Sequence, residues 1–164
     1  MIQQMLGTAI ALTIAMSSCA QPTAETNSTA AKTIEMDTEN DQKRIEALLF
    51  QYRDALNASD VDAALALYTE DGVFMPSGAP TTIGQEQVRG AYEFVFSNIQ
   101  LNIEFSIDEI VVEGKYAFAR TTSKGTTLIH ATGETVPEEN RELFVLEKGD
   151  DSRKIARYMF NKMQ

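Results

Sequence analysis

The hydrophobic period of the chain changes once, near residue 100. Before that point apolar residues recur every three or four positions, as in Ile45, Leu48, Leu49 and Tyr52, which is the stripe of an amphipathic helix. After it, apolar and polar residues alternate, as in LNIEFSI over 101–107. Helices followed by antiparallel strands predict an α+β fold in which the helices pack on a sheet.

Three helices are predicted in the first part of the chain. The first starts at Asp41 and ends near Ser59. Ser59 followed by Asp62 resembles a capping box, which predicts the start of a second helix, and Gly72 is placed to end that helix. A third apolar stripe at helical spacing covers 88–99.

Short strands account for most of the remainder. A glycine and charged residues at 113–115 predict a hairpin turn, and SKG at 123–125 predicts a bulge or a turn. The strands that we expect are 73–75, 101–107, 110–112, 116–120, 126–130, 141–147 and 154–160.

The N-terminal segment is typical of an exported protein. Residues 1–18 carry no charge and read as a signal peptide, and Cys19 follows two serines, as in a lipoprotein signal that leads to lipidation of the cysteine. Ordinary cleaved secretion and a retained apolar N-terminus are the alternatives, because the first residues lack lysine and arginine. Residues 19–40 are polar and predict a disordered tether, which leaves 41–164 as the folded domain.

Charge and composition exclude several function classes. Lysine and arginine number 14 against 24 aspartates and glutamates, so the net charge of −10 would repel a nucleic acid backbone. Cys19 is the only cysteine and His130 the only histidine, so neither a thiolate metal site nor a histidine cluster is expected. The chain has no glycine-rich phosphate loop, and we expect no cofactor.

Two stretches of the sequence resemble a known family. The run ALNASDVDAALALYTEDGVFMPSGAPTTIGQEQVRGAY over 55–92, and KIARYMFN over 154–161, look like the SnoaL-like bacterial branch of the nuclear transport factor 2-like superfamily. This resemblance implies a cone-shaped fold with three N-terminal helices packed on a curved antiparallel sheet. It also implies a cavity between the helices and the sheet. The superfamily contains isomerases, cyclases, dehydratases and binding proteins, so the resemblance leaves the activity open.

Ketosteroid isomerase, a member of the same superfamily, suggests roles for individual residues. Its tyrosine donor corresponds to Tyr52 in QYRDALN, and its protonated acid corresponds most closely to Glu142 in RELFVLE. The aspartate that acts as its base corresponds to Met75, which is apolar and cannot take a proton. The resemblance therefore implies the family's cavity without the family's base.

Other polar residues have both a functional and a structural interpretation. Glu70 and Asp71 could form a catalytic loop, but at a helix end they are expected to face water. His130 is either a general base in the cavity or a histidine in water at the end of a strand. Tyr52 either packs in the core or lines the cavity.

The cavity residues that we expect come from several elements. Arg120 with Glu134, and Arg141 with Glu142, could form surface ion pairs, whereas an arginine that points inward would select an anionic ligand. The candidate catalytic residues are Tyr52, His130 and Glu142. The candidate ligand-binding residues are Tyr52, Tyr68, Met75, Phe96, Arg120, Arg141 and Asn161.

Two functions are compatible with this sequence. The first is a lipid-anchored binding domain on the periplasmic side of the cell envelope that holds a largely apolar small molecule. The second is an isomerase, cyclase or dehydratase that uses Tyr52, His130 or Glu142. The missing acid at Met75 favours binding. Strands with apolar residues on both faces, such as YAFA and LFVL, predict a homodimer.

Overall fold

A computed structural model describes residues 24–150 and 152–163 of the protein. The predicted signal peptide, Cys19 and the first residues of the predicted tether lie outside the described residues. The elements, in chain order, are α1 (Ala24–Ala58), α2 (Val61–Ala66), β1 (Tyr68–Met75), β2 (Thr82–Ile83), α3 (Gly84–Asn98), β3 (Ile99–Glu113), β4 (Tyr116–Ile129), β5 (Glu134–Lys148) and β6 (Arg153–Lys162).

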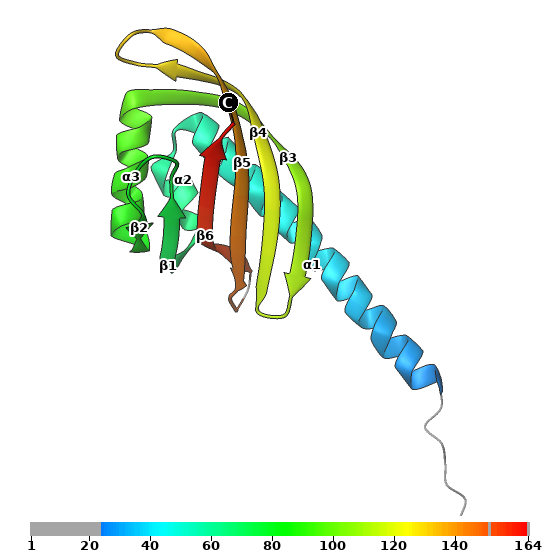
Figure 1. Ribbon diagram of the computed structural model, residues 1–164. Coiled ribbons are helices and arrows are strands. Elements are labelled where there is room, and N and C mark those ends of the chain that lie inside the picture. Colours follow the sequence, from blue (N-terminus) through cyan, green and yellow to red (C-terminus); the bar gives the residue numbers. More distant parts are fainter. Residues whose placement is uncertain (1–23, 151, 164) are drawn as a thin grey trace, which may run out of the picture.

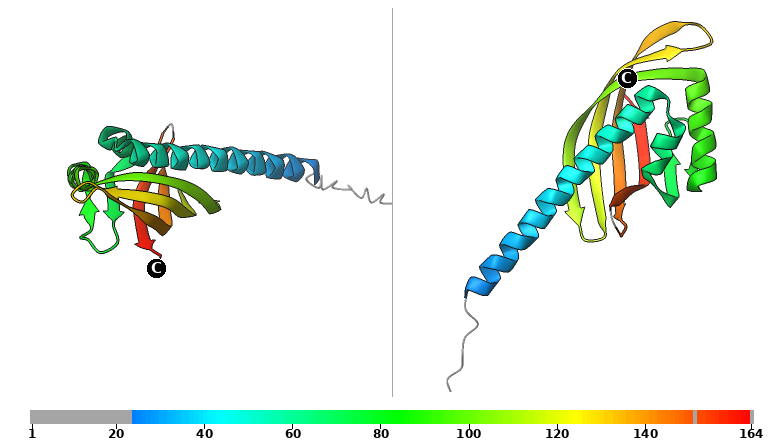
Figure 2. Two further views of the ribbon diagram at one scale, coloured as in Figure 1. Left: turned by 90° about the horizontal axis from the view of Figure 1, so that it is seen from above. Right: turned by 180° about the vertical axis from the view of Figure 1, so that it is seen from behind.

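The strands form one curved sheet in the order β2-β1-β6-β5-β4-β3. All neighbouring strands are antiparallel except β1 and β6, which run parallel. The helices lie on one face of this sheet, with α1 crossing it diagonally, and no described element covers the opposite face (Figures 1 and 2). The predicted α+β fold with helices on a curved sheet is confirmed.

Helix α1 is longer than the sequence predicts. Its second half packs on the sheet through buried Ile45, Leu49 and Tyr52. Its first half continues beyond the sheet (Figure 2), so residues 24–40 are helical and the prediction of a disordered tether there is wrong. The reason is that no proline or glycine occurs between Ala24 and Ala58, and a helix that is already nucleated extends easily. No helix of the described residues has both the length and the hydrophobicity needed to cross a bilayer.

The corner after α1 differs from the prediction in two details. Ser59 adopts a left-handed conformation with φ of 53°, and Asp60 instead caps α2 by accepting a hydrogen bond from the Ala63 N–H at 2.9 Å. Helix α2 ends at Ala66, so Gly72 lies inside β1 and does not end the helix. It occupies an irregularity in the β1–β6 pairing, where the Tyr68 ring leaves no room for a side chain.

The segment 123–125 also differs from the prediction of a bulge or turn. Strand β4 pairs with both neighbours without interruption through these residues. Gly125 is needed there because the backbone of β3 passes close to it at Asn102. The bulge in this hairpin lies instead in β3, between Ile107 and Glu109, within a strand that the sequence predicts as two.

The hydrophobic core fills the space between the helices and the inner face of the sheet. Its centre is aromatic: Tyr52 makes edge contacts with four rings, among them Phe144 and Tyr158, and these two rings stack on each other at 4.4 Å between centroids. Aromatic packing of this density holds α1 and α3 on the sheet.

Candidate functional site

A small cavity lies in the aromatic core, between α1, α3 and the inner face of the sheet. Its volume is about 130 Å³, close to that of an engineered protein cavity that accepts one benzene molecule. Most of the wall is apolar. The apolar residues that line the cavity are Leu56, Phe74, Pro76, Val95, Ile99, Leu101, Ile103 and Phe160. The apolar wall suits one ring or a compact chain.

Three buried tyrosines form a hydroxyl network at one end of this cavity. The Tyr92 hydroxyl is hydrogen bonded to the hydroxyls of Tyr52 and of Tyr68, the latter at 2.8 Å. Two hydrogen bonds join three hydroxyl groups, so one proton is left without an acceptor inside the network. Tyr52 and Tyr92 both line the cavity and can offer this proton to a ligand.

Burial keeps these hydroxyl groups protonated. The pKa values of Tyr52, Tyr68, Tyr92 and Tyr158 are all raised above the ordinary tyrosine value, chiefly because the low-polarity core disfavours the charged form. The network is therefore a donor of hydrogen bonds and not a base.

Glu142 lies on the same wall and is also buried, with 4% of its surface exposed. It accepts hydrogen bonds from the hydroxyl of Thr121 and, at 3.1 Å, from that of Tyr158. Burial raises the pKa of its carboxyl group, and the hydrogen bonds from these two residues and Ser123 oppose part of that rise. Glu142 therefore keeps its proton to a higher pH than an exposed glutamate, and in that form it can donate a hydrogen bond.

Two more polar residues of the cavity wall, Glu138 and Asn140, lie on β5 together with Glu142. Glu138, Asn140 and Glu142 alternate on β5, so their side chains share the inner face, and all three line the cavity. Glu138 accepts hydrogen bonds from Thr127 at 3.0 Å, Asn140 at 3.0 Å and the Lys162 ammonium at 3.1 Å. Lys162 also lines the cavity and is exposed, so the cavity reaches the surface at this end.

Of the predicted site residues, Tyr52 and Glu142 line the cavity. Tyr68 and Phe96 are buried behind its wall, where Tyr68 bonds to the Tyr92 hydroxyl and Phe96 stacks on the Tyr92 ring at 5.6 Å. These two residues support Tyr92 and do not reach the cavity themselves.

His130 lies on the surface. It follows the end of β4, is exposed, and places Nδ1 3.0 Å from the carbonyl oxygen of Ser97 at the end of α3. It is not among the residues that line the cavity. The structure therefore places it in water at the end of a strand, the second of its two interpretations.

Four more predicted residues lie outside the cavity, on the uncovered face of the sheet. Alternation along each strand turns them outward: Phe74 faces the cavity, so Met75 next to it faces away and pairs with Met159. Arg120 contacts Asp108 at 2.9 Å and Glu109 at 3.7 Å, in place of the expected Glu134. Arg141 and Asn161 are exposed and pair with each other across β5 and β6.

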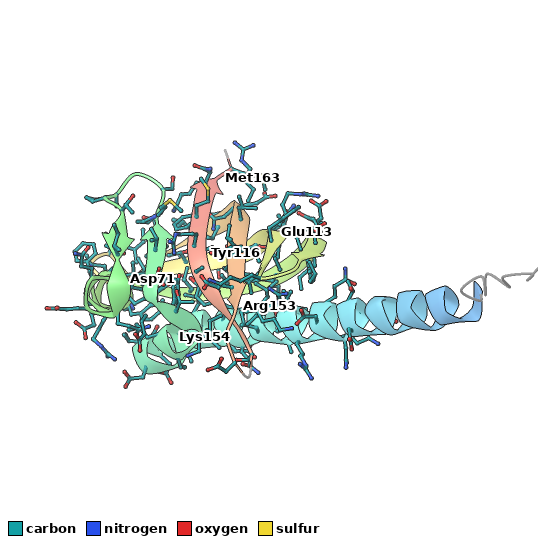
Figure 3. All side chains as sticks on the ribbon, turned by 90° about the horizontal axis from the view of Figure 1, so that it is seen from below. Asp71, Glu113, Tyr116, Arg153, Lys154 and Met163 are labelled. Atoms are coloured by element: carbon teal, nitrogen blue, oxygen red, sulfur yellow. The ribbon has the colours of Figure 1, made fainter. Side chains whose placement is uncertain are left out.

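The two carboxylates of the segment 67–76, which could have formed a catalytic loop, do not line the cavity. Glu70 and Asp71 are both exposed, as expected. Asp71 lies on β1 (Figure 3), away from the cavity, and its nearest cation is Arg157 at 3.7 Å. The contribution of this segment to the cavity is Phe74 and Pro76.

Sequence reasoning missed Tyr92, Tyr158, Glu138, Asn140 and Lys162 as cavity residues. Tyr92 was recognisable as part of the apolar stripe of α3, but its hydroxyl partners are 24 and 40 residues away in the chain. For the β5 residues the available signal was the i, i+2, i+4 spacing of polar residues that ends at Glu142. Among the described residues, no group of His, Cys, Asp and Glu side chains is placed to hold a metal ion.

Comparison with known proteins places this geometry in a family. A family model for the SnoaL-like domain matches residues 49–158. A ketosteroid isomerase-like protein from Erwinia carotovora atroseptica is 35% identical in sequence, with a TM-score of 0.72 over 74% of this chain and 95% of that one. No curated protein matches the chain.

More distant solved structures share the fold. A conserved protein from Planctomyces limnophilus is 18% identical, with a TM-score of 0.66 over 76% of this chain and 99% of that one. A proposed dehydratase of the NTF2-like family from Streptomyces avermitilis is 16% identical, with a TM-score of 0.66 over 77% of this chain and 98% of that one. At these identities the likeness shows the fold alone.

Proposed function

The chain belongs to the SnoaL-like domain family of the NTF2-like superfamily, and on that premise we propose that it binds a compact, mostly apolar molecule through one acceptor oxygen. The ligand body lies against the apolar wall of the cavity. Its oxygen, such as that of a ketone, accepts hydrogen bonds from the tyrosine network and from protonated Glu142.

The observation that carries this proposal is that two buried polar side chains, Tyr52 and Glu142, line an otherwise mostly apolar cavity. Tyr52 is 0% exposed and Glu142 is 4% exposed, so a ligand oxygen beside them exchanges no hydrogen bonds with bulk water. Donors that are already oriented and desolvated favour an acceptor oxygen without further rearrangement.

Binding is favoured over catalysis because the cavity offers no free base. Met75 and His130 lie elsewhere, and the two carboxyl groups that line the cavity are Glu138 and Glu142. Burial raises the pKa of Glu142, which favours its protonated form. Both carboxylate oxygens of Glu138 already contact Thr127, Asn140 or Lys162, so a ligand would have to compete with these partners.

Proton transfer at carbon, as in an isomerase or dehydratase, is the second candidate. A carboxyl group of raised pKa beside buried tyrosines favours it, since this arrangement also stabilises an enolate oxygen. Glu138 would then be the base. Incubating cyclohexanone with the protein in D₂O decides between the two: exchange of the α-hydrogens, lost in Glu138→Gln, supports catalysis, and retention of those hydrogens by a bound ketone supports binding.

The binding proposal predicts that Tyr52→Phe weakens the affinity for cyclohexanone about tenfold, because one hydrogen bond to the ketone is lost. Calorimetric titration measures this affinity. Tyr116→Phe is the matched control, because Tyr116 is exposed on the surface of β4 and its variant should bind as the wild type does. Equal loss in both variants, or none in either, would contradict the proposal.

The same titration should depend on pH through Glu142. Its raised pKa means that affinity is highest where the carboxyl group is protonated and falls as the pH rises through that raised pKa, where the group loses its proton and with it the ability to donate. Glu142→Gln keeps a donor at every pH, so the pH dependence should disappear in that variant.

The N-terminal sequence leads us to place the protein at the periplasmic side of the cell envelope, anchored by lipid on Cys19. Replacing Cys19 with serine should move the protein from the membrane fraction to the soluble fraction, because serine cannot carry the lipid. Fractionation of cells that express each form measures this. Wild-type protein that is soluble and starts at another residue would count against the anchor.

A homodimer through the uncovered face of the sheet completes the proposal. Phe118, Leu143 and Met159 expose 36%, 39% and 36% of their surface there. Leu143 and Met159 are direct neighbours across β5 and β6, so these two apolar side chains lie side by side. Exposed apolar side chains that gather on a face that no described element covers are typical of an interface between subunits.

Phe118→Glu should convert the dimer to a folded monomer, because burying a charge in an apolar interface is costly. Light scattering gives the mass. Phe94→Glu is the matched control: Phe94 is 70% exposed on α3, away from this face, and its variant should stay dimeric. A wild-type monomer at tens of micromolar would refute the proposed dimer.

A further inference from the structure

The side chain of Asn140 has a defined orientation in the wall of the cavity. Its Nδ2 donates to Glu138 Oε1 at 3.0 Å and to Ser123 Oγ at 3.2 Å. Rotating the amide by half a turn would place Oδ1 against an oxygen of the Glu138 carboxyl group, which forms an ion pair with Lys162, so two acceptor oxygens would face each other. The amide therefore stays in this orientation, and Oδ1 is the polar atom that takes no part in these two hydrogen bonds.

Asn140 Oδ1 has no hydrogen-bond partner among the described residues, although only 6% of the Asn140 surface is exposed. Buried acceptors are nearly always satisfied in folded proteins, by the chain, by water or by a ligand. Asn140 lines the cavity, so the group that satisfies Oδ1 is brought by the contents of the cavity.

The position of Asn140 relative to Glu142 defines the shape of that partner. The two residues are separated by one residue on β5, so their Cα atoms lie about 7 Å apart along the strand. Side chains two residues apart on a strand lie on the same face, so one small ring with an oxygen at each end can contact both residues. The cavity, at about 130 Å³, accommodates a body of that size.

We infer that the ligand carries two oxygen functions on one small apolar body, a ketone oxygen at Tyr52 and Glu142 and a hydroxyl group that donates to Asn140 Oδ1. This inference rests on the proposed function, because the ketone end is the contact proposed above. The substrate class is thus a hydroxylated cyclic ketone, and Asn140 is the residue that selects the hydroxyl group.

The test compares two ketones of equal size, 4-hydroxycyclohexanone and 4-methylcyclohexanone, by chemical-shift titration of the protein. Wild-type protein should bind the hydroxyl compound about tenfold more tightly, because the hydroxyl satisfies Oδ1 and the methyl group leaves it unpaired. Asn140→Leu removes the acceptor and should reverse the preference, since the wall then favours the methyl group. Tyr52→Phe should weaken both ketones by the same factor.

The outcomes separate this inference from the proposed function. Wild-type protein that binds both ketones equally, or the methyl compound more tightly, overturns the inference and leaves the ketone contact standing, with water on Asn140 Oδ1. If neither ketone binds, the proposed function fails as well. The comparison of the two ketones in the wild type needs no variant, so a failure of Asn140→Leu to fold leaves the test intact.

Discussion

Replacing Arg153 with methionine is expected to lower the free energy of unfolding by about 3–5 kcal/mol, as is typical when one partner of a buried ion pair is removed. Arg153 is 5% exposed at the start of β6. Its Nε and Nη2 contact Asp41 Oδ2, both at 2.9 Å. Methionine retains the packing of the aliphatic stem but leaves the half-buried carboxylate of Asp41 without its partner.

The same guanidinium group also holds the turn between β3 and β4. It donates to the carbonyl oxygens of Gly114 at 2.8 Å and Lys115 at 3.0 Å. Arg153 thus joins α1, β6 and this turn, and Figure 3 shows it beside α1. The variant removes the guanidinium donor of the Gly114 carbonyl oxygen and one of the two donors of the Lys115 carbonyl oxygen, which keeps the Lys148 N–H. The loss of stability should therefore be well above that of a surface ion pair.

Denaturant unfolding of Arg153→Met measures this loss, with Arg120→Met as the matched control. Arg120 also pairs with an aspartate at 2.9 Å, but its side chain is 54% exposed, so its variant should lose less than about 1 kcal/mol. Adding Asp41→Asn to Arg153→Met should cost little more, because the stranded charge is then removed. Equal losses at Arg153 and Arg120 would show that the buried contacts contribute nothing.

Gly125→Ala should also be severely destabilising, by about 3 kcal/mol or more, because the backbone of β3 has to move. A Cβ atom at this position would lie 2.1 Å from the carbonyl oxygen of Asn102 and 2.8 Å from the Cα of Ile103. Both are backbone atoms that are paired into the sheet, so they cannot turn aside as a side chain would. The clash therefore separates β3 from β4 next to Ile103, a residue of the cavity wall.

Gly90→Ala is the matched control for this substitution. Gly90 lies in the interior of α3, and a Cβ atom there would meet nothing within 4 Å. Alanine should therefore raise the stability by about 0.5–1 kcal/mol, since it restricts the unfolded chain and favours the helix. Opposite signs for the two Gly→Ala changes are the expected result of thermal unfolding. A Gly125→Ala variant as stable as the wild type would contradict the close approach of the β3 and β4 backbones at this position.

Local pattern was sufficient for most elements and for two of the cavity residues. The apolar period of α1 placed Tyr52 on its buried stripe, and the resemblance to ketosteroid isomerase singled out Glu142. Both line the cavity. These predictions succeed because the periods of helix and strand are local properties of the chain.

Met75 shows where local reasoning ends. The family resemblance aligned it with a cavity residue, but on β1 its neighbour Phe74 faces inward and Met75 faces outward. In a strand, a shift of one residue exchanges the two faces, and the register is set by pairing with β6, a strand about 80 residues later in the sequence. Arg120, Arg141 and Asn161 are on the outer face for the same reason.

The sequence by itself determined the order of helices and strands, the absence of a base at Met75, and the family to which the chain is similar. Only the tertiary structure decided which polar groups meet: the Tyr92 hydroxyl with those of Tyr52 and Tyr68, and the Asn140 amide with Glu138. The physical reason is that hydrogen bonds require contact within about 3 Å. Contacts of that length between α1, α3 and β1 depend on how these elements pack, which no local period specifies.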